Sequence, residues 1–268
     1  MGYGIHPLAT AVAFAFSSSA IGQADPAGAV PVLDDVVVSA DKLRPVPISS
    51  TVSSSSIEQM RPATSDTASL LRNIPGVSTY GAGGVSSLPV IRGLADDRIR
   101  IKVDGMDLIA SCPNHMNPPL SYIDPTNVDT LRVYSGITPV SVGGDSIAGT
   151  IIADTLAPVF AAPGQDYLAT GQIGGFYRSN GNAWGANIAA TAATENISVT
   201  YTGSSARADN YKAGGNFKTT TATGRVGHTL PLDEVGSTAY ESLNQMLSFA
   251  VKGGNHLVEA KFGFQHIP

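Results

Sequence analysis

The sequence predicts an α+β domain, with a small mixed sheet and short helices, followed by a run of antiparallel β-strands. Residues 49–160 combine a short helical pattern with short alternating segments, whereas residues 161–268 consist of long alternating segments joined by tight turns. Charged residues make up only 14% of the 268 residues, against about 25% in soluble domains. This low charge, with 29 glycines, is unusual for a soluble domain of this length.

The first 24 residues have the pattern of a secretory signal peptide. An apolar run over residues 8–16 is followed by small residues, and cleavage is expected after Ala24. No Lys or Arg precedes the run, and a short buried helix is the alternative interpretation. We therefore expect an exported chain, in which the single cysteine, Cys112, has no partner for an internal disulfide.

Residues 25–48 are predicted to form a linker that contains one short β-branched run, residues 35–40. Pro45 and Pro47 follow this run, so it has no neighbouring strand of its own. Such a strand either adds to the sheet edge of a partner protein or is the first strand of the next domain. The pattern alone leaves both interpretations open.

Residues 49–160 carry one helix signal and several strand signals. Residues 65–74 begin with capping residues and end at a Pro-Gly pair, which predicts a short helix. Residues 98–103 alternate strictly and residues 131–134 form a second strand. A glycine-rich loop, residues 143–149, leads into a third at 150–153 and lacks the spacing of a phosphate-binding loop.

Residues 161–268 alternate over longer stretches. Asn180-Gly181 predicts a hairpin between residues 169–178 and 183–193, and Gly253-Gly254 predicts another between strands that each carry one apolar face. Strands of about ten residues, apolar outside and polar inside, fit the wall of an outer-membrane barrel. A soluble β-sandwich shows the same alternation. The signal peptide and the low charge favour the barrel.

Six segments, in order, resemble landmarks of one known family. They are residues 35–40 (DVVVSA), 71–77 (LRNIPGV), 89–94 (PVIRGL), 103–105 (VDG), 124–136 and 143–150 (GGDSIAGT). With these segments the chain resembles the TonB-dependent outer-membrane receptors of Gram-negative bacteria. The resemblance implies an α+β plug domain over residues 49–160, followed by antiparallel strands of an incomplete outer-membrane β-barrel over residues 161–268.

The resemblance also implies two contacts. The run at 35–40 looks like the TonB box, so TonB, the periplasmic energy-coupling protein, would bind Asp35, Val36, Val37, Val38, Ser39 and Ala40. The barrel would contact outer-membrane lipid. Barrels of this family have about 22 strands, whereas the residues after 160 have room for about six. We therefore expect an N-terminal fragment or a prematurely ended product, which alone forms no pore because of its open edges.

The segment SCPNHMNPP, residues 111–119, holds the candidate metal ligands. The sulfurs of Cys112 and Met116 are soft donors that favour Cu(I), and His115 is a further candidate ligand. Three prolines exclude a continuous helix, so the sulfurs would converge through a loop. From the residues alone, a buried thiol and a gap-filling methionine remain the alternative.

Placed in the family, the Cys-x-x-x-Met pattern resembles the TonB-dependent copper receptors, the OprC-like branch. The resemblance implies energy-coupled copper uptake, with Cu(I) as the transported ligand and further ligands on the barrel. A receptor for siderophores or other iron complexes is the first rival, and an exported metal-binding module without transport is the second.

Two classes of function have no support in the sequence. A net charge of −5 without a basic cluster argues against nucleic acid as a partner. Cys112 and His115 lie three positions apart without a third orienting group, which argues against a thiol enzyme. We therefore expect a receptor and not an enzyme.

Overall fold

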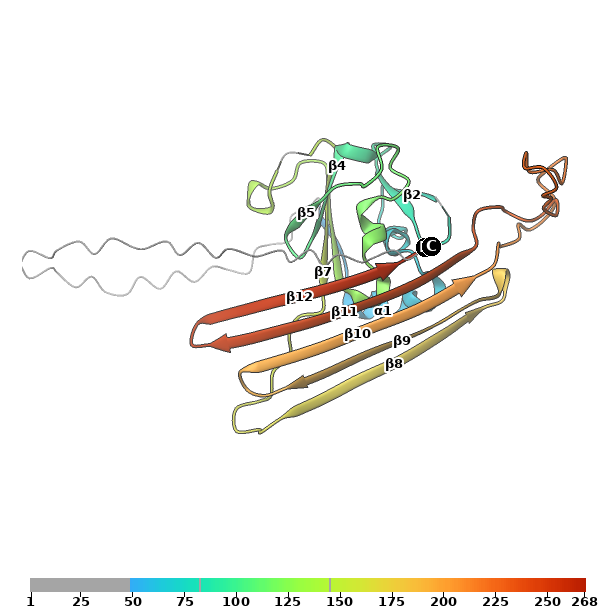
Figure 1. Cartoon of the computed structure of the whole chain (residues 1–268). Coiled ribbons are helices and arrows are strands. Elements are labelled where there is room, and N and C mark those ends of the chain that lie inside the picture. Colours follow the sequence, from blue (N-terminus) through green and yellow to red (C-terminus); the bar gives the residue numbers. More distant parts are fainter. Residues whose placement is uncertain (1–48, 82, 145) are drawn as a thin grey trace, which may run out of the picture. The chain divides into compact units, whose positions relative to one another are not determined.

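The computed structural model describes residues 49–81, 83–144 and 146–268. The predicted signal peptide, linker and TonB box lie outside these residues. The described chain contains two larger sheets, one in the plug domain and one formed by the long strands near the C-terminus (Figure 1).

The plug domain is built on a five-stranded mixed sheet with the strand order β1-β6-β7-β4-β5. Its strands are β1 (Ser49–Val52), β4 (Ile99–Val103), β5 (Met106–Leu108), β6 (Val128–Ser135) and β7 (Gly149–Thr155). Strands β4 and β7 pair in parallel and the other neighbours are antiparallel. A separate hairpin consists of β2 (Val77–Gly81) and β3 (Ser87–Ile91). The predicted α+β class with a small mixed sheet is confirmed.

The helices of the plug domain are short. They are α1 (Ser54–Met60) and 3₁₀ turns at Arg61–Ala63, Thr67–Leu71, Asp96–Arg98, Pro119–Tyr122, Pro125–Asn127 and Val140–Val142. The helix predicted over residues 65–74 is therefore only the 3₁₀ turn Thr67–Leu71. The Asp66 carboxylate caps it by accepting the Ala68 N–H at 3.2 Å. No helix among the described residues is long and apolar enough to cross a membrane.

The plug core lies between the mixed sheet and these turns. Ile99, Ile101 and Val103 all face it, as their alternation with basic residues predicted. The fully buried large side chains around them are Ile57, Leu70, Leu71, Ile91, Leu120, Leu131 and Ile151. Gly149 begins β7 with φ 137°, and a Cβ there would lie 2.0 Å from the Tyr134 carbonyl oxygen. The close approach of two backbones therefore requires glycine at this position.

The second sheet, called here the long-strand sheet, has the order β12-β11-β10-β9-β8 and is antiparallel throughout. Its strands are β8 (Leu168–Arg178), β9 (Ala183–Ala193), β10 (Ile197–Ala208), β11 (Tyr240–Gly253) and β12 (His256–His266). Both predicted hairpins form. Gly181, with φ 75°, sits in the turn between β8 and β9, and Gly254, with φ 55°, sits in the turn between β11 and β12.

The two faces of the long-strand sheet reverse the usual pattern of a soluble protein. On β11 the apolar Leu247, Phe249 and Val251 are exposed, with Leu247 46% accessible. The polar Asn244 and Ser248 on the opposite face are buried, with Asn244 only 4% accessible. A soluble sandwich would cover the apolar face and expose the polar one. The sheet therefore has the pattern of a barrel wall, apolar outside and polar inside.

Candidate functional site

The candidate metal ligands lie in the loop between β5 and the turn Pro119–Tyr122. The His115 N–H donates to the Cys112 carbonyl oxygen at 2.9 Å, which closes a tight turn. His115 adopts φ 51° in this turn. The prolines on either side fix φ and remove N–H donors, which explains why no helix forms. Cys112 and Met116 thus belong to one turn and the residue that follows it, and the absence of a helix agrees with the sequence prediction.

A tyrosine that the sequence analysis missed holds both ends of this loop. The Tyr122 hydroxyl accepts the Ser111 N–H at 2.6 Å and donates to the Asn117 carbonyl oxygen at 2.8 Å. The Ser111 hydroxyl lies 2.7 Å from the same oxygen. One side chain therefore spans the segment that carries Cys112 and Met116. Nothing in the local sequence distinguishes this tyrosine from a core aromatic residue.

The two sulfur-bearing residues are accessible. Met116 is 57% exposed and Cys112 is half-buried. The Ser86 hydroxyl donates to the Met116 carbonyl oxygen at 2.9 Å, so this end of the loop is fixed through its backbone while the side chain stays in solvent. Met116 does not fill a gap in the core. An ion from outside the domain can approach the Met116 side chain, and Cys112 is partly exposed.

His115 has a different environment from the sulfurs. Its Nε2 atom lies 3.8 Å from Oδ2 of Asp97. The ring lies in a recess shared with Asp97, Leu108 and Ile109. The described residues contain no group of three or more His, Cys, Asp or Glu side chains that could hold a metal ion. Any ion bound by Cys112 and Met116 would therefore need further donors from water, from methionine or from another part of the protein.

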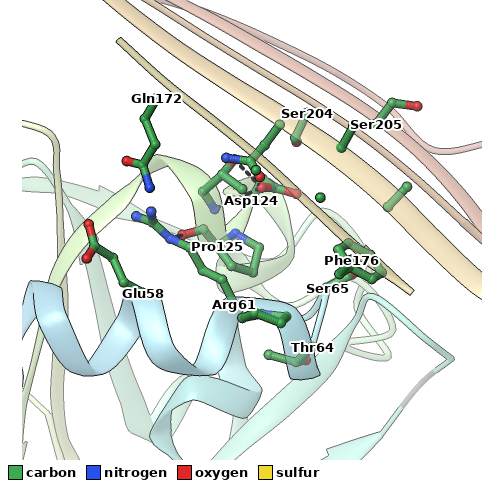
Figure 2. A pocket seen from close by; sticks show the side chains of 17 residues that line it. Glu58, Arg61, Thr64, Ser65, Asp124, Pro125, Gln172, Phe176, Ser204 and Ser205 are labelled. Carbon is green, nitrogen blue, oxygen red and sulfur yellow. Dashed lines mark hydrogen bonds between the residues drawn. The ribbon is translucent and has the colours of Figure 1, made fainter. Parts of the chain in front are cut away.

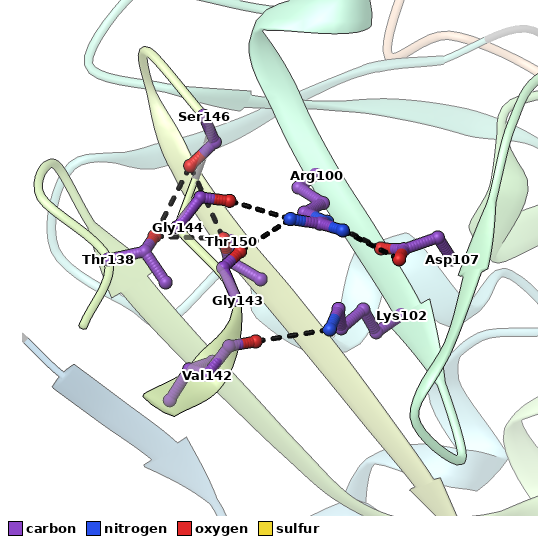
Figure 3. Close-up of polar contacts among 9 residues, drawn as sticks. All are labelled: Arg100, Lys102, Asp107, Thr138, Val142, Gly143, Gly144, Ser146 and Thr150. Carbon is purple, nitrogen blue, oxygen red and sulfur yellow. Dashed lines mark hydrogen bonds and ion pairs between the residues drawn. The ribbon is translucent and has the colours of Figure 1, made fainter. Parts of the chain in front are cut away.

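The strand before the loop is anchored by Arg100 (Figure 3). Its guanidinium binds both carboxylate oxygens of Asp107, at 2.5 and 2.7 Å. The same group donates to the carbonyl oxygens of Gly143 and Gly144, at 2.5 and 2.6 Å. The hydrogen bonds from Arg100 hold the pKa of Asp107 below its ordinary value. Arg100 thus joins β5 to the glycine-rich loop.

The glycine-rich loop at 143–149 has a structural part in this arrangement. Lys102 donates to the Val142 carbonyl oxygen at 3.1 Å, in addition to the contacts from Arg100 (Figure 3). On the other side, the hydroxyls of Thr138 and Thr150 are 2.8 Å apart. A phosphate-binding loop would direct N–H groups at an anion. Here the carbonyl oxygens of Gly143 and Gly144 accept hydrogen bonds from Arg100.

The buried polar face of the long-strand sheet contacts the plug domain directly. Asn244 on β11 donates to Oδ2 of Asp124 at 3.0 Å, and Thr202 on β10 donates to Oδ1 of Asn127 at 2.5 Å. Lys261 on β12 donates to Oδ2 of Asp104 at 3.1 Å. The sequence predicted the polar face of these strands but not its partners in the plug domain. Alternation shows which residues share a face, but it does not show which part of the protein packs against that face.

A pocket of about 170 Å³ lies between α1, the turn Pro125–Asn127 and strands β8–β10 (Figure 2). Arg61 lines it and donates to the carbonyl oxygens of Pro125 and Val128, at 3.1 and 3.0 Å. Burial lowers the pKa of Arg61 and raises the pKa of Asp124, which lines the same pocket. The interior between plug and strands is therefore polar and charged.

Comparisons with known proteins identify a plug domain and solved structures with a similar fold. The model of the TonB-dependent receptor plug domain matches residues 42–150. No curated protein matches the chain significantly. Among solved structures, "Copper transporter OprC" is 25% identical over 82% of this chain, with a TM-score of 0.63. The chain spans 30% of the length of that protein.

Two other solved structures show the same fold at lower identity. The FrpB iron transporter from Neisseria meningitidis (F3-3 variant) is 19% identical over 78% of this chain and 30% of its own, with a TM-score of 0.62. The Serratia marcescens hemophore receptor HasR is 17% identical over 82% of this chain and 31% of its own, with a TM-score of 0.64. Residues 42–150 are therefore a TonB-dependent receptor plug domain, and an outward-apolar long-strand sheet follows it.

Proposed function

We propose that this chain is part of a TonB-dependent outer-membrane receptor for copper uptake, in which Cys112 and Met116 bind the transported ion. The observation that supports this most is the placement of Cys112, which is half-buried, and Met116, which is exposed, on one loop of the plug domain that Tyr122 fixes at both ends. Thioether and thiolate sulfur are soft ligands that prefer Cu(I). His115 is a weaker candidate, since its ring lies beside Asp97.

The fold alone does not separate copper from iron. The similar TM-scores of the copper transporter and the two lower-identity structures mean that the backbone is compatible with several substrates. The donor chemistry favours copper, because a ferric siderophore supplies its own hard oxygen ligands and needs no sulfur from the receptor. A receptor for iron complexes is therefore the alternative that any test must include.

In the proposed mechanism, copper binds at Cys112 and Met116 and further donors come from outside this loop. TonB then binds residues 35–40, whose sequence predicts a strand that can add to a sheet edge. Movement of the plug must break its contacts with the strands, among them Lys261 to Asp104 and Asn244 to Asp124. These contacts are hydrogen bonds and ion pairs, whose partners can bind water once they separate.

Loss of either sulfur is expected to weaken Cu(I) binding by more than about tenfold, because each supplies one of two soft ligands. The purified chain would be titrated with Cu(I) without oxygen, against a coloured Cu(I) chelator. The variants are Cys112→Ser and Met116→Leu. Met106→Leu is the matched control, since Met106 on β5 is 62% exposed, close to the exposure of Met116.

Two results would count against the proposal. Unchanged Cu(I) affinity in the double variant Cys112→Ser/Met116→Leu would remove the site. Binding of ferric enterobactin, but not of Cu(I), by the unmodified chain would instead favour an iron-complex receptor. Quenching of Trp184, the single tryptophan, gives a readout for the iron complex that does not depend on the chelator.

A further inference from the structure

The connection between β10 and β11 forms an arm, residues 211–235, with an unusual charge. It carries Lys212, Lys218 and Arg225, and its first carboxylate is Asp233. Lys212 lies 3.7 Å from Asp233. Lys218 and Arg225 have no acidic partner within 4 Å among the described residues. A chain of net charge −5 thus concentrates unpaired cations on one arm.

The base of the arm is fixed by two asparagines. Asn180 accepts the Lys212 N–H at 2.7 Å and donates to the Lys212 carbonyl oxygen at 2.8 Å, as a neighbouring strand would. Asn210 accepts the N–H groups of Thr238 and Ala239, at 3.0 and 2.9 Å. The arm therefore leaves the sheet in a defined direction, beyond the ends of β10 and β11 (Figure 1).

The tip of the arm holds an apolar side chain out in solvent. The His228 N–H donates to the Arg225 carbonyl oxygen at 3.1 Å, which closes a turn, and the Leu230 N–H donates to the Thr221 carbonyl oxygen at 2.9 Å. Val226 lies inside this turn and is fully exposed, at 106%. Phe217, next to Lys218, is 55% exposed. Lys218 Nζ lies over the Phe217 ring, 5.5 Å from its centroid, and leaves more than half of that side chain exposed. The arm thus combines cations with exposed apolar side chains.

The arm starts at an aromatic end of the long-strand sheet. Tyr177 and Trp184 are paired across β8 and β9 on the exposed apolar face, and Trp184 pairs in turn with Arg207 on β10. The arm begins four residues after Arg207. Aromatic residues at the end of an apolar strand face mark the level where lipid tails give way to headgroups. The arm therefore extends from the headgroup level.

We propose that this arm docks onto anionic lipid headgroups, with Lys218 and Arg225 bound to phosphate groups and Val226 and Phe217 inserted between them. Exposed apolar residues flanked by cations are the pattern of an interfacial anchor, and lipid phosphates supply the opposite charge. The proposal rests on the membrane location in the proposed function. The arm would fix the height of the sheet in the bilayer, independently of the copper ligands.

The full chain would be tested by flotation with vesicles of phosphatidylcholine alone and of phosphatidylcholine with one quarter phosphatidylglycerol. We expect tighter binding to the anionic vesicles, by about fivefold for each cation that contacts the surface. Lys218→Gln/Arg225→Gln should remove most of this preference. Arg72→Gln/Lys252→Gln changes the net charge equally at sites outside the arm and should keep it.

Each remaining outcome has a defined meaning. Equal binding of the unmodified chain to both vesicles, or an equal loss in the control, overturns the arm proposal alone. Absence of binding to either vesicle overturns the membrane location as well. Inorganic phosphate at millimolar concentration should not compete, and competition would overturn the assignment to lipid in favour of free phosphate.

Discussion

Replacing Leu247 by arginine is expected to weaken the partition of the chain from water into phosphatidylcholine vesicles by about 2–4 kcal/mol, or roughly thirtyfold to several hundredfold. Leu247 lies near the middle of β11, where its outward neighbours are Tyr201 and Phe262. A guanidinium at that position must enter the apolar zone or distort the strand. The substitution also removes the favourable free energy of transferring the leucine side chain from water into the bilayer.

The matched control is Glu241→Gln, which changes the net charge by the same amount. Glu241 is exposed on the same face of β11, close to the end of the strand. Because the cost of a charge depends on its depth, removing one at this end should change the partition little. Partition is measured by sedimentation of the vesicles with the chain. Equal behaviour of the two variants would mean that the exposed apolar face is not the lipid-facing side.

This experiment addresses what the alternation of the strands could not decide. A period of two residues assigned Leu247, Phe249 and Val251 to one face from the sequence alone. A sandwich and a barrel wall share that period, so it does not say which face is covered. The structure adds the missing information through Asn244, a polar residue that is buried because its amide binds Asp124 of the plug.

The candidate site was predictable from side-chain chemistry and less so from local structure. Cys112 and Met116 are rare donors close together, and the prolines between and after them exclude a helix whatever the tertiary fold. Tyr122 could not be identified because its hydroxyl joins residues on both sides of a loop whose shape depends on the whole domain. Local patterns do not encode such a contact.

For the helix predicted over residues 65–74, the local sequence signals were correct but the predicted length was not. The capping residue and the stop signal were correct, since Asp66 caps the turn and Pro75-Gly76 follows it. The length was wrong because Thr67 donates its hydroxyl to the Ile123 carbonyl oxygen at 2.5 Å and is buried. Packing against a distant segment tightens the turn into a 3₁₀ helix, and propensity does not anticipate this.

Replacing Asp124 by alanine is expected to lower the free energy of unfolding by about 2–4 kcal/mol. Its carboxylate caps the turn Pro125–Asn127 by accepting the Thr126 N–H at 2.9 Å, and it also accepts the Thr126 hydroxyl. The other oxygen accepts the amide of Asn244, which lies on the long-strand sheet. Asp124 is 8% exposed and Asn244 is 4% exposed, so the Asn244 amide would lose a buried acceptor.

A double-mutant cycle separates the cap from the contact between plug and strands. Asn244→Ala removes the partner on β11, and Asp124→Ala/Asn244→Ala completes the cycle. We expect a coupling energy of about 1 kcal/mol from chemical denaturation in detergent micelles, followed by circular dichroism. Additive effects would mean that Asp124 stabilises only its own turn and that the plug is not held to the sheet at this point.

The pH dependence provides a second test of the same carboxylate. Burial raises the pKa of Asp124 above its ordinary value of 3.8, against the opposing effect of the Thr126 hydrogen bonds and of Arg61. A pKa that is higher in the folded state means that the folded chain binds the proton more tightly than the unfolded chain. The stability from this group is therefore complete below 3.8 and is lost as the pH rises through the raised pKa.

Asp124→Asn should abolish that loss, because the amide does not titrate. The unfolding free energy of the unmodified chain should then fall relative to Asp124→Asn as the pH rises above 3.8. Asp107→Asn is the opposite control, since Arg100 lowers the pKa of Asp107, so that its contribution is lost when the pH falls. Parallel curves for the unmodified chain and Asp124→Asn would show that burial does not govern this carboxylate. The stability of the folded chain would then not depend on the charge of Asp124.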